Sequence, residues 1–249
     1  MIRVEHLSVA YGKKQVLQDF SLTIRDKELV ALIGPNGSGK SSLLKAVARI
    51  LPYEGKIFLD EVEARDMSRK DYAKRLAVVG QFNDMAFDMT VLDMVLMGRT
   101  PYKGLLERDT DKDRAMAGEA LAAVGMESYA ARSLRALSGG ERQRAVLARA
   151  LVQETDHLLL DEATNHLDIY YQLKLLSMVK DTKLTVVAAL HDMNLALAYG
   201  DRIVALKEGK LLFDEAPENV TPAMIEALYA TPCTLHEADG RPVAVFKKP

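Results

Sequence analysis

The stretch that decides the fold of this 249-residue chain is Gly34-Pro35-Asn36-Gly37-Ser38-Gly39-Lys40-Ser41. It matches the pattern Gly-x-x-x-x-Gly-Lys-Ser/Thr of a phosphate-binding loop. An apolar run over residues 28–33 precedes it and predicts a strand. After it we expect a helix, ended by Pro52, whose apolar face is formed by Leu43, Leu44, Val47 and Ile50. A strand, a glycine-rich turn and a helix in this order form the structural context that the motif requires.

The residue types of this loop suit a chain of phosphates. Glycines let backbone N–H groups surround phosphate oxygens, and the start of the following helix adds partial positive charge. Lys40 is expected to reach the β- and γ-phosphates, and Ser41 to ligate Mg²⁺. The predicted nucleotide contacts are Gly34, Pro35, Asn36, Gly37, Ser38, Gly39, Lys40, Ser41 and Ser42.

Strand and helix signals alternate over most of the chain. Besides the strand over residues 28–33, we expect strands over residues 2–9, 20–24, 56–59, 76–80, 157–160, 185–189, 203–206 and 210–213. Strands that alternate with helices predict a mostly parallel, covered sheet. A short helix that begins at Thr221-Pro222 and a hairpin that turns at Asp239-Gly240 are expected near the C-terminus.

The segment between Phe82 and Leu151 differs, because apolar residues recur there at helical spacing and no strand is indicated. A Thr-x-x-Asp cap predicts a helix from Thr90 to Met97. A second helix, over residues 111–124, is expected to bury Met116, Ala120, Ala123 and Val124. We therefore expect a helical insert.

Composition excludes several classes of protein. The chain has 33 basic and 35 acidic residues, a net charge of −2 and a pI of about 6.2, so it lacks the basic excess of nucleic-acid-binding proteins. No apolar run approaches the ~20 residues that span a bilayer. A single cysteine, Cys233, permits no internal disulfide, and the cytosol is the default compartment.

Two acids follow the apolar run His157-Leu158-Leu159-Leu160. Ligands of α/β sheets bind beyond the carboxyl ends of strands, so Asp161 and Glu162 are positioned to meet a nucleotide bound by the loop. Neighbouring strand residues point to opposite faces, which predicts different roles for the two acids. Asp161 is expected to help hold Mg²⁺, and Glu162 to orient and deprotonate the attacking water.

The sequence Leu137-Ser138-Gly139-Gly140-Glu141 contains a Ser-x-x-Glu capping box that predicts a helix start. Two glycines beside the cap also open that helix start to an approaching anion. Both interpretations are compatible.

The order of these motifs resembles the ATP-binding cassette of ABC transporters over nearly the whole chain. It consists of the phosphate loop, Gln81, the Ser-Gly-Gly box, Asp161-Glu162, Asn165-His166-Leu167-Asp168 and His191. The resemblance implies an α/β fold: a P-loop NTPase (RecA-like) core with a mostly parallel sheet, an N-terminal antiparallel β subdomain and an inserted α-helical subdomain. It implies one domain over residues 1–249, with the helical subdomain at about 82–151.

In that family two cassettes enclose ATP between them, so the resemblance implies a homodimer with ATP and Mg²⁺ as cofactors. Ser138, Gly139 and Gly140 then contact the γ-phosphate of the partner's ATP, and Asp168 crosses the dimer interface. The other implied contacts are Gln81 on Mg²⁺ and the water, His191 on the γ-phosphate, and Tyr11 stacked on adenine. A tyrosine at a strand end can equally be structural. Where this chain has Ala163, many relatives have proline, which puts the stiffness of that loop in doubt.

A finer resemblance is to the ATPase subunits of importers for iron chelates (siderophores), haem or cobalamin. It rests on residues 97–102, Met-Gly-Arg-Thr-Pro-Tyr, and on the segments around Asn165 and His191. It implies separate integral membrane permease subunits, an external substrate-binding protein acting indirectly, no nucleic acid, and a place at the cytoplasmic face of the cell membrane. Phe82, Met85 and Phe87 are either subdomain core or the groove that receives the membrane subunit.

Two alternatives stay open at this point. One is an importer ATPase for zinc or manganese, and the other is a soluble scaffold ATPase without transport, for example in iron–sulfur assembly. The sequence leaves the cargo, the direction of transport and the membrane partners undecided.

Overall fold

The molecule is built around a six-stranded sheet whose strands follow the order β10-β9-β3-β8-β7-β6. The computed structural model describes residues 1–80, 89–104, 106–165 and 167–247. Neighbouring strands of this sheet are parallel except β9 and β10, which are antiparallel. The strands are β3 (Leu29–Ile33), β6 (Leu76–Val79), β7 (His157–Asp161), β8 (Thr185–Ala189), β9 (Arg202–Lys207) and β10 (Lys210–Glu215).

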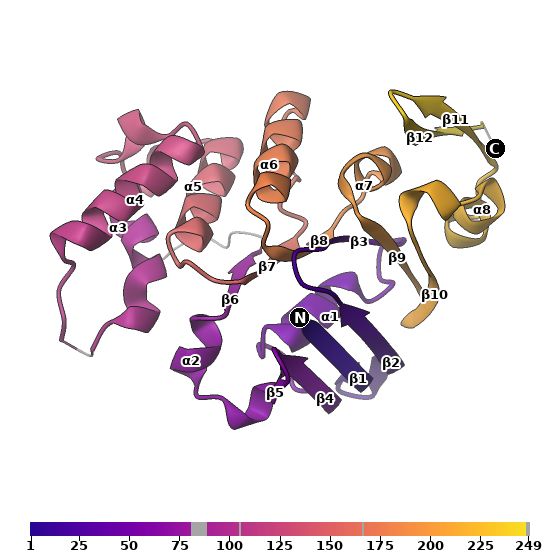
Figure 1. Cartoon of the computed structure of the whole chain (residues 1–249), viewed down its shortest axis with the longest axis horizontal. Helices are drawn as coiled ribbons and strands as arrows, with labels where there is room; N and C mark the ends of the chain where they lie inside the picture. The colour runs from indigo at the N-terminus through magenta and orange to yellow at the C-terminus, as the bar shows by residue number, and fades with distance from the viewer. Residues whose placement is uncertain (81–88, 105, 166, 248–249) are drawn as a thin grey trace.

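A second, antiparallel sheet of order β2-β1-β4-β5 lies beside it (Figure 1). Its strands are β1 (Ile2–Tyr11), β2 (Lys14–Ile24), β4 (Glu54–Leu59) and β5 (Val62–Glu63). Alternate residues of β1 are buried, as expected for a sheet with one covered face. The antiparallel subdomain expected at the N-terminus is therefore present.

Helices α3, α4 and α5 form one end of the molecule, and the C-terminal helix and hairpin form the opposite end (Figure 1). The described part of residues 82–151 contains these helices and no strand, although a single β-bridge joins Thr90 and Ser133. The remaining elements are α1 (Lys40–Val47), α2 (Arg69–Ala73), α3 (Val91–Leu96), α4 (Asp111–Ala123), α5 (Gly139–Leu151), α6 (Ile169–Asp181), α7 (Met193–Tyr199), α8 (Pro222–Tyr229), β11 (Cys233–Ala238) and β12 (Arg241–Phe246).

The parallel sheet is covered on both faces, which explains why its strands are continuously apolar. Residues of β3 alternate between two cores: Ala31 and Ile33 belong to the core shared with α3–α7, and Val30 and Leu32 to the core shared with α1 and the antiparallel sheet. All five residues of β3 are buried. The strand that leads into the phosphate loop is thus fixed from both sides.

The predicted apolar face of the helix after the phosphate loop is wrong at its C-terminal end, where it included Ile50. Helix α1 ends at Val47, two residues before Arg49, which has a left-handed φ of 57°. Ile50 consequently lies outside the helix and is 64% exposed, whereas Leu43, Leu44 and Val47 are buried as predicted. The chain therefore leaves the helix before Pro52 can end it.

The predicted buried stripe of the second insert helix is also partly wrong. Helix α4 buries Ala117, Ala120 and Leu121, while Ala123 is exposed. Small alanine side chains carry too little hydrophobic signal to fix the helix rotation from the sequence. Its start was predictable, because Thr110 and Asp113 form a capping box there.

Candidate active site

The phosphate loop keeps a shape that only glycine allows at two positions. Gly34 has φ 151°, and a Cβ atom there would lie 2.2 Å from the carbonyl oxygen of Leu206. Gly39 has φ 109° and a Cβ atom there would lie 2.7 Å from Leu17. The loop is therefore pressed against β9 on one side and β2 on the other, with its backbone fixed between β3 and α1.

Lys40, the first residue of α1, is buried inside this loop. Its Nζ atom donates to the carbonyl oxygens of Gly34 at 2.7 Å and Pro35 at 3.2 Å. Burial lowers the pKa of Lys40, and the negative charges of Glu162 and Asp161 oppose that shift. The positive charge is thus held at the centre of the loop and faces the two acids.

Ser41 and Asp161 lie side by side, although 120 residues separate them. The Ser41 hydroxyl donates to Oδ1 of Asp161 at 2.7 Å. Asp161 is the last residue of β7 and is buried; burial raises its pKa, and the bond from Ser41 acts against this. A hydroxyl and a carboxylate oxygen at one place form the hard oxygen donor set that Mg²⁺ prefers, so the residues fit that ion.

Glu162 and His191 form a close pair of a carboxylate and an imidazole in the site. Nε2 of His191 lies 2.8 Å from Oε1 of Glu162, and their side chains are 38% and 17% exposed. Leu190 follows the last residue of β8, and His191 comes next, whereas Glu162 directly follows the last residue of β7. The two strands are neighbours in the sheet, which brings these side chains together.

We expected strand alternation to point the side chains of Asp161 and Glu162 in different directions, and this expectation is wrong. Strand β7 ends at Asp161, and Glu162 has a left-handed φ of 55°. A positive φ at a residue other than glycine is uncommon and is enriched at functional sites. The backbone turn, and not strand alternation, therefore directs Glu162 toward His191.

Asn165 belongs to a motif that the sequence analysis quoted, but its contact with Glu162 was not predicted. Its Nδ2 donates to Oε2 of Glu162 at 2.9 Å, and its backbone N–H donates to the carbonyl of Glu162 at 3.0 Å. Asn165 thus closes a tight turn and holds the second carboxylate oxygen of Glu162. The Glu-x-x-Asn spacing after a strand is the signal that could have indicated this contact.

The Ser-Gly-Gly box begins α5, as the capping box predicted. The Glu141 N–H donates to Ser138 Oγ, and the Ser138 N–H donates to Glu141 at 2.8 Å. Hydrogen bonds from the Ser138 backbone and hydroxyl lower the pKa of Glu141. Ser138 and Gly139 are exposed, and a Cβ atom at Gly139 would meet nothing within 4 Å. This helix start is open to a ligand, yet among the described residues no hydrogen bond joins it to the phosphate loop of the same chain.

The remaining predicted residues lie apart from this centre or outside the described part. Tyr11 ends β1 and is 48% exposed. Asp168 is exposed and caps α6, where its Oδ1 accepts from the Tyr171 N–H at 3.0 Å. Gln81, Phe82, Met85 and Phe87 fall outside the described residues.

The Gly-Arg-Thr-Pro segment holds the helical part together. Arg99 is buried, and its guanidinium donates to Asp113 at 3.1 Å, to Glu154 at 2.9 Å and to the carbonyl of Val152 at 2.9 Å. A Cβ atom at Gly98 would lie 2.3 Å from the carbonyl oxygen of Arg149. This segment therefore acts in packing within the chain.

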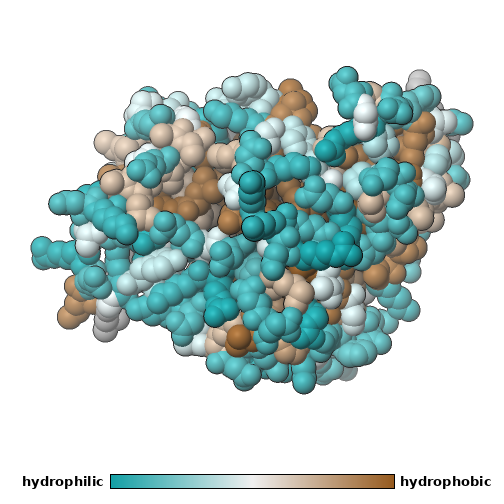
Figure 2. Space-filling model, viewed as in Figure 1, coloured by the Kyte–Doolittle hydropathy of each residue, from teal (hydrophilic) through white to brown (hydrophobic). Residues whose placement is uncertain are grey.

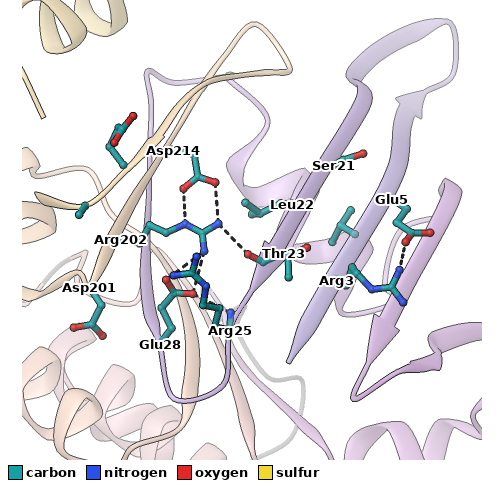
Figure 3. A pocket seen from close by; sticks show the side chains of 13 residues that line it. Arg3, Glu5, Ser21, Leu22, Thr23, Arg25, Glu28, Asp201, Arg202 and Asp214 are labelled. Atoms are coloured by element: carbon teal, nitrogen blue, oxygen red, sulfur yellow. Dashed lines mark hydrogen bonds and ion pairs between the residues drawn. The ribbon is translucent and has the colours of Figure 1, made fainter. Parts of the chain in front are cut away.

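A cavity of about 710 Å³ lies at the amino ends of β3 and β9, away from the carboxyl ends of the strands that carry the residues above. Figure 3 shows Arg202 pointing toward Asp214, Glu28 and Thr23. Its guanidinium donates to Asp214 at 2.8 Å, to Glu28 at 3.1 Å and to the Thr23 carbonyl at 2.9 Å. This arginine joins the two sheets at the amino ends of β3 and β9, and its donors are already used.

Comparisons with known proteins agree with this geometry. Residues 17–165 match the family model described as ABC transporter. The chain is 42% identical over 225 residues to the petrobactin import ATP-binding protein FpuC of Bacillus anthracis. This alignment covers 88% of this chain and 83% of FpuC. It is 37% identical over 252 residues to the ferric enterobactin transport ATP-binding protein FepC of Escherichia coli (strain K12), with 98% and 93% covered.

Solved structures show the same fold. A protein described as a metal-chelate type ABC transporter in an inward-facing conformation superposes with a TM-score of 0.84 at 28% identity, covering 99% of this chain and 96% of that one. The dimeric ATP-binding cassette MJ0796 with ADP and Pi superposes with a TM-score of 0.77 at 28% identity, covering 87% and 98%. Among the described residues, no helix has the length and apolarity needed to cross a bilayer.

Proposed function

This chain belongs to the ABC transporter family of ATP-binding proteins, and from that premise we propose that it is the ATP-hydrolysing subunit of an importer. The observation that carries the proposal is the Glu162–His191 contact beside the Lys40 loop and the Ser41–Asp161 pair. One edge of the sheet thus holds a cation, an oxygen donor set and a carboxylate paired with an imidazole.

In this proposal the chemistry is positioning and electrostatic stabilisation of a transferring phosphoryl group. Lys40 binds the phosphates of ATP. Glu162 accepts a proton from the attacking water, Asn165 keeps its carboxylate oriented, and His191 holds the opposite carboxylate oxygen and the γ-phosphate. Ser41 and Asp161, with Gln81, would hold Mg²⁺, which when bound neutralises phosphate charge.

A homodimer is part of the proposal, because within one chain the phosphate loop and the open start of α5 share no hydrogen bond among the described residues. Gly139 and its neighbours Ser138 and Gly140 would contact the ATP bound by the partner chain. Ile169 and Tyr170 follow Asp168 directly and are 64% and 63% exposed. Hydrophobic residues reach the surface over α6 (Figure 2), and a second copy would cover them.

The proposed place of the protein is the cytoplasmic face of the cell membrane, attached to integral permease subunits. A cavity of about 630 Å³ separates the core from the helical part, and its lining includes Arg49, Tyr72, Met97, Pro101 and Gln153. Its mixed basic and apolar lining suits a short amphipathic helix of a membrane subunit. We assign residues 1–249 to one domain, in which residues 82–151 form the helical subdomain that contributes one wall of this groove.

The proposed cargo is an iron chelate, with haem or cobalamin in the same class. Its support is the similarity to relatives whose names describe petrobactin and ferric enterobactin transport, over most of both chains. No observation favours the scaffold ATPase or an importer of bare zinc or manganese.

The test is ATP hydrolysis by the chain in nanodiscs with and without its candidate membrane subunits. A stable complex whose membrane subunits change the hydrolysis rate supports the transport ATPase. Hydrolysis that is indifferent to every membrane partner, together with failure to form a complex, would favour the scaffold ATPase.

A further inference from the structure

The C-terminal hairpin is bonded to the helix that follows His191. The side chain of Asn194, in the first turn of α7, donates from Nδ2 to the carbonyl of Ala244 at 3.2 Å. The Ala244 N–H donates back to Oδ1 of Asn194 at 2.8 Å. Ala244 lies in β12, opposite Leu235 of β11. One amide side chain therefore satisfies both backbone groups that Ala244 presents on the open edge of β12.

A further contact joins the parts of the same C-terminal segment to one another. Tyr229, the last residue of α8, packs edge to face on Phe246 of β12, with ring centroids 6.2 Å apart. Burial, and then the charge of Asp192, raises the pKa of Tyr229 to about 12, while the backbone N–H of Gly34 acts against this. The ring pair thus joins α8 to β12, the strand that also bonds to Asn194.

Helix α7 depends on such external contacts, because it has only seven residues and short helices are marginal by themselves. Its first turn is capped by Asp192, whose Oδ1 accepts from the N–H groups of Asn194 at 2.7 Å and Leu195 at 3.1 Å. The same residue, Asn194, therefore links the cap that follows His191 to the hairpin.

We propose that Asn194 is a positioning residue for hydrolysis: its two bonds to Ala244 fix the start of α7 and thereby hold His191 against Glu162. The C-terminal hairpin then acts as a support for the active site. This inference rests on the proposed function, since His191 and Glu162 are assigned to ATP hydrolysis there.

The test compares Asn194→Ala with Asn219→Ala, an exposed asparagine whose side chain reaches only toward Glu215 at 3.5 Å. Imidazole NMR signals report the site directly, because the chain has five histidines and the His191 signal is identified by its loss in His191→Gln. We expect Asn194→Ala to shift the His191 signal and to leave those of His6 and His157 unchanged. In the dimer, kcat should fall about three- to tenfold at unchanged KM for ATP, as expected for losing a hydrogen-bonded support.

A second variant removes the same link from the other side. Ala244→Pro deletes the N–H that bonds to Asn194 and spares the ladder to β11, because that N–H points to the open edge. If the link is the cause, Ala244→Pro reproduces both effects, and the double variant is no worse than either single one. Additive effects, or an unchanged His191 signal and kcat in Asn194→Ala, would overturn the inference. Because the NMR signal needs no turnover, an inactive wild-type protein would contradict the proposed function and still leave this link measurable.

Discussion

Nε2 of His191 lies 2.8 Å from Oε1 of Glu162, and these residues follow two neighbouring strands of the parallel sheet. Asn165 holds the other carboxylate oxygen of Glu162 at 2.9 Å. The carboxylate is thus fixed from two directions before any substrate arrives, which is the preorganisation that a general base needs.

Replacing the carboxylate of Glu162 tests its role as the base. We expect Glu162→Gln to lower kcat by a factor of about 10² to 10⁴, since an amide cannot accept the proton. Nucleotide affinity, measured by fluorescence titration, should stay unchanged because Lys40 is untouched. Glu119→Gln, on the exposed side of α4, is the matched control. Normal turnover in Glu162→Gln would refute the assignment.

Removing the support of Glu162 should have a smaller effect than removing the carboxylate. Asn165→Ala loses one side-chain hydrogen bond, so we expect kcat to fall about three- to tenfold at unchanged KM for ATP. Steady-state ATPase assays separate the two constants. A loss as large as that of Glu162→Gln would instead mean that Asn165 itself contacts the reacting groups.

Mixing two inactive chains tests whether each site is shared between two copies. Lys40→Ala removes the cation of the loop, and Gly139→Arg blocks the open start of α5. In a heterodimer, one site combines both changes and the other has neither, so the mixture should recover nucleotide trapping at one site per dimer. Recovery is measured with radiolabelled ATP. If each chain forms its site alone, mixing restores nothing.

Two glycine substitutions should change stability in opposite directions. Gly98→Ala places a Cβ atom 2.3 Å from the carbonyl of Arg149, and we expect a loss of about 1–3 kcal/mol in the free energy of unfolding. Gly118→Ala lies in the exposed interior of α4 with nothing within 4 Å, and we expect a gain of about 0.4–1 kcal/mol. Urea unfolding measures both. Equal effects would contradict the close packing of residues 97–102.

Asp113 should make stability depend on pH. Hydrogen bonds from the Thr110 backbone and hydroxyl, then from Arg99, hold the pKa of Asp113 far below its ordinary value. A carboxyl group whose pKa is lowered in the folded state stabilises fully above its unfolded pKa of about 3.9, and this stabilisation is lost as pH falls toward the folded value.

Asp113→Asn should therefore lower the unfolding temperature at pH 7, and the difference from the wild type should shrink below about pH 4. Circular dichroism at a series of pH values measures this, with Asp111→Asn on the exposed side of the same turn as control. A difference that stays constant down to pH 2 would show that Asp113 acts by hydrogen-bond geometry and not by charge.

Much of the fold could be predicted because local patterns and tertiary packing agree. The structure confirms the turn between strand and helix at Gly34 to Ser41 and the buried strands of the parallel sheet. It also confirms the helix caps at Thr90, Thr221 and Ser138. The end of α1 and the rotation of α4 were not predictable, since a left-handed Arg49 and weakly hydrophobic alanines leave little trace in the sequence.

The sequence by itself determined which residues could carry phosphate chemistry, because the required residue types and their spacing are local. Only the tertiary structure decided which of them meet. It brings Ser41 to Asp161 across 120 positions and His191 to Glu162 across neighbouring strands. It also brings Asn165 into contact with Glu162, which has a positive φ. Asn194 likewise contacts Ala244 at the open edge of a strand. These contacts arise from backbone paths that no single segment encodes.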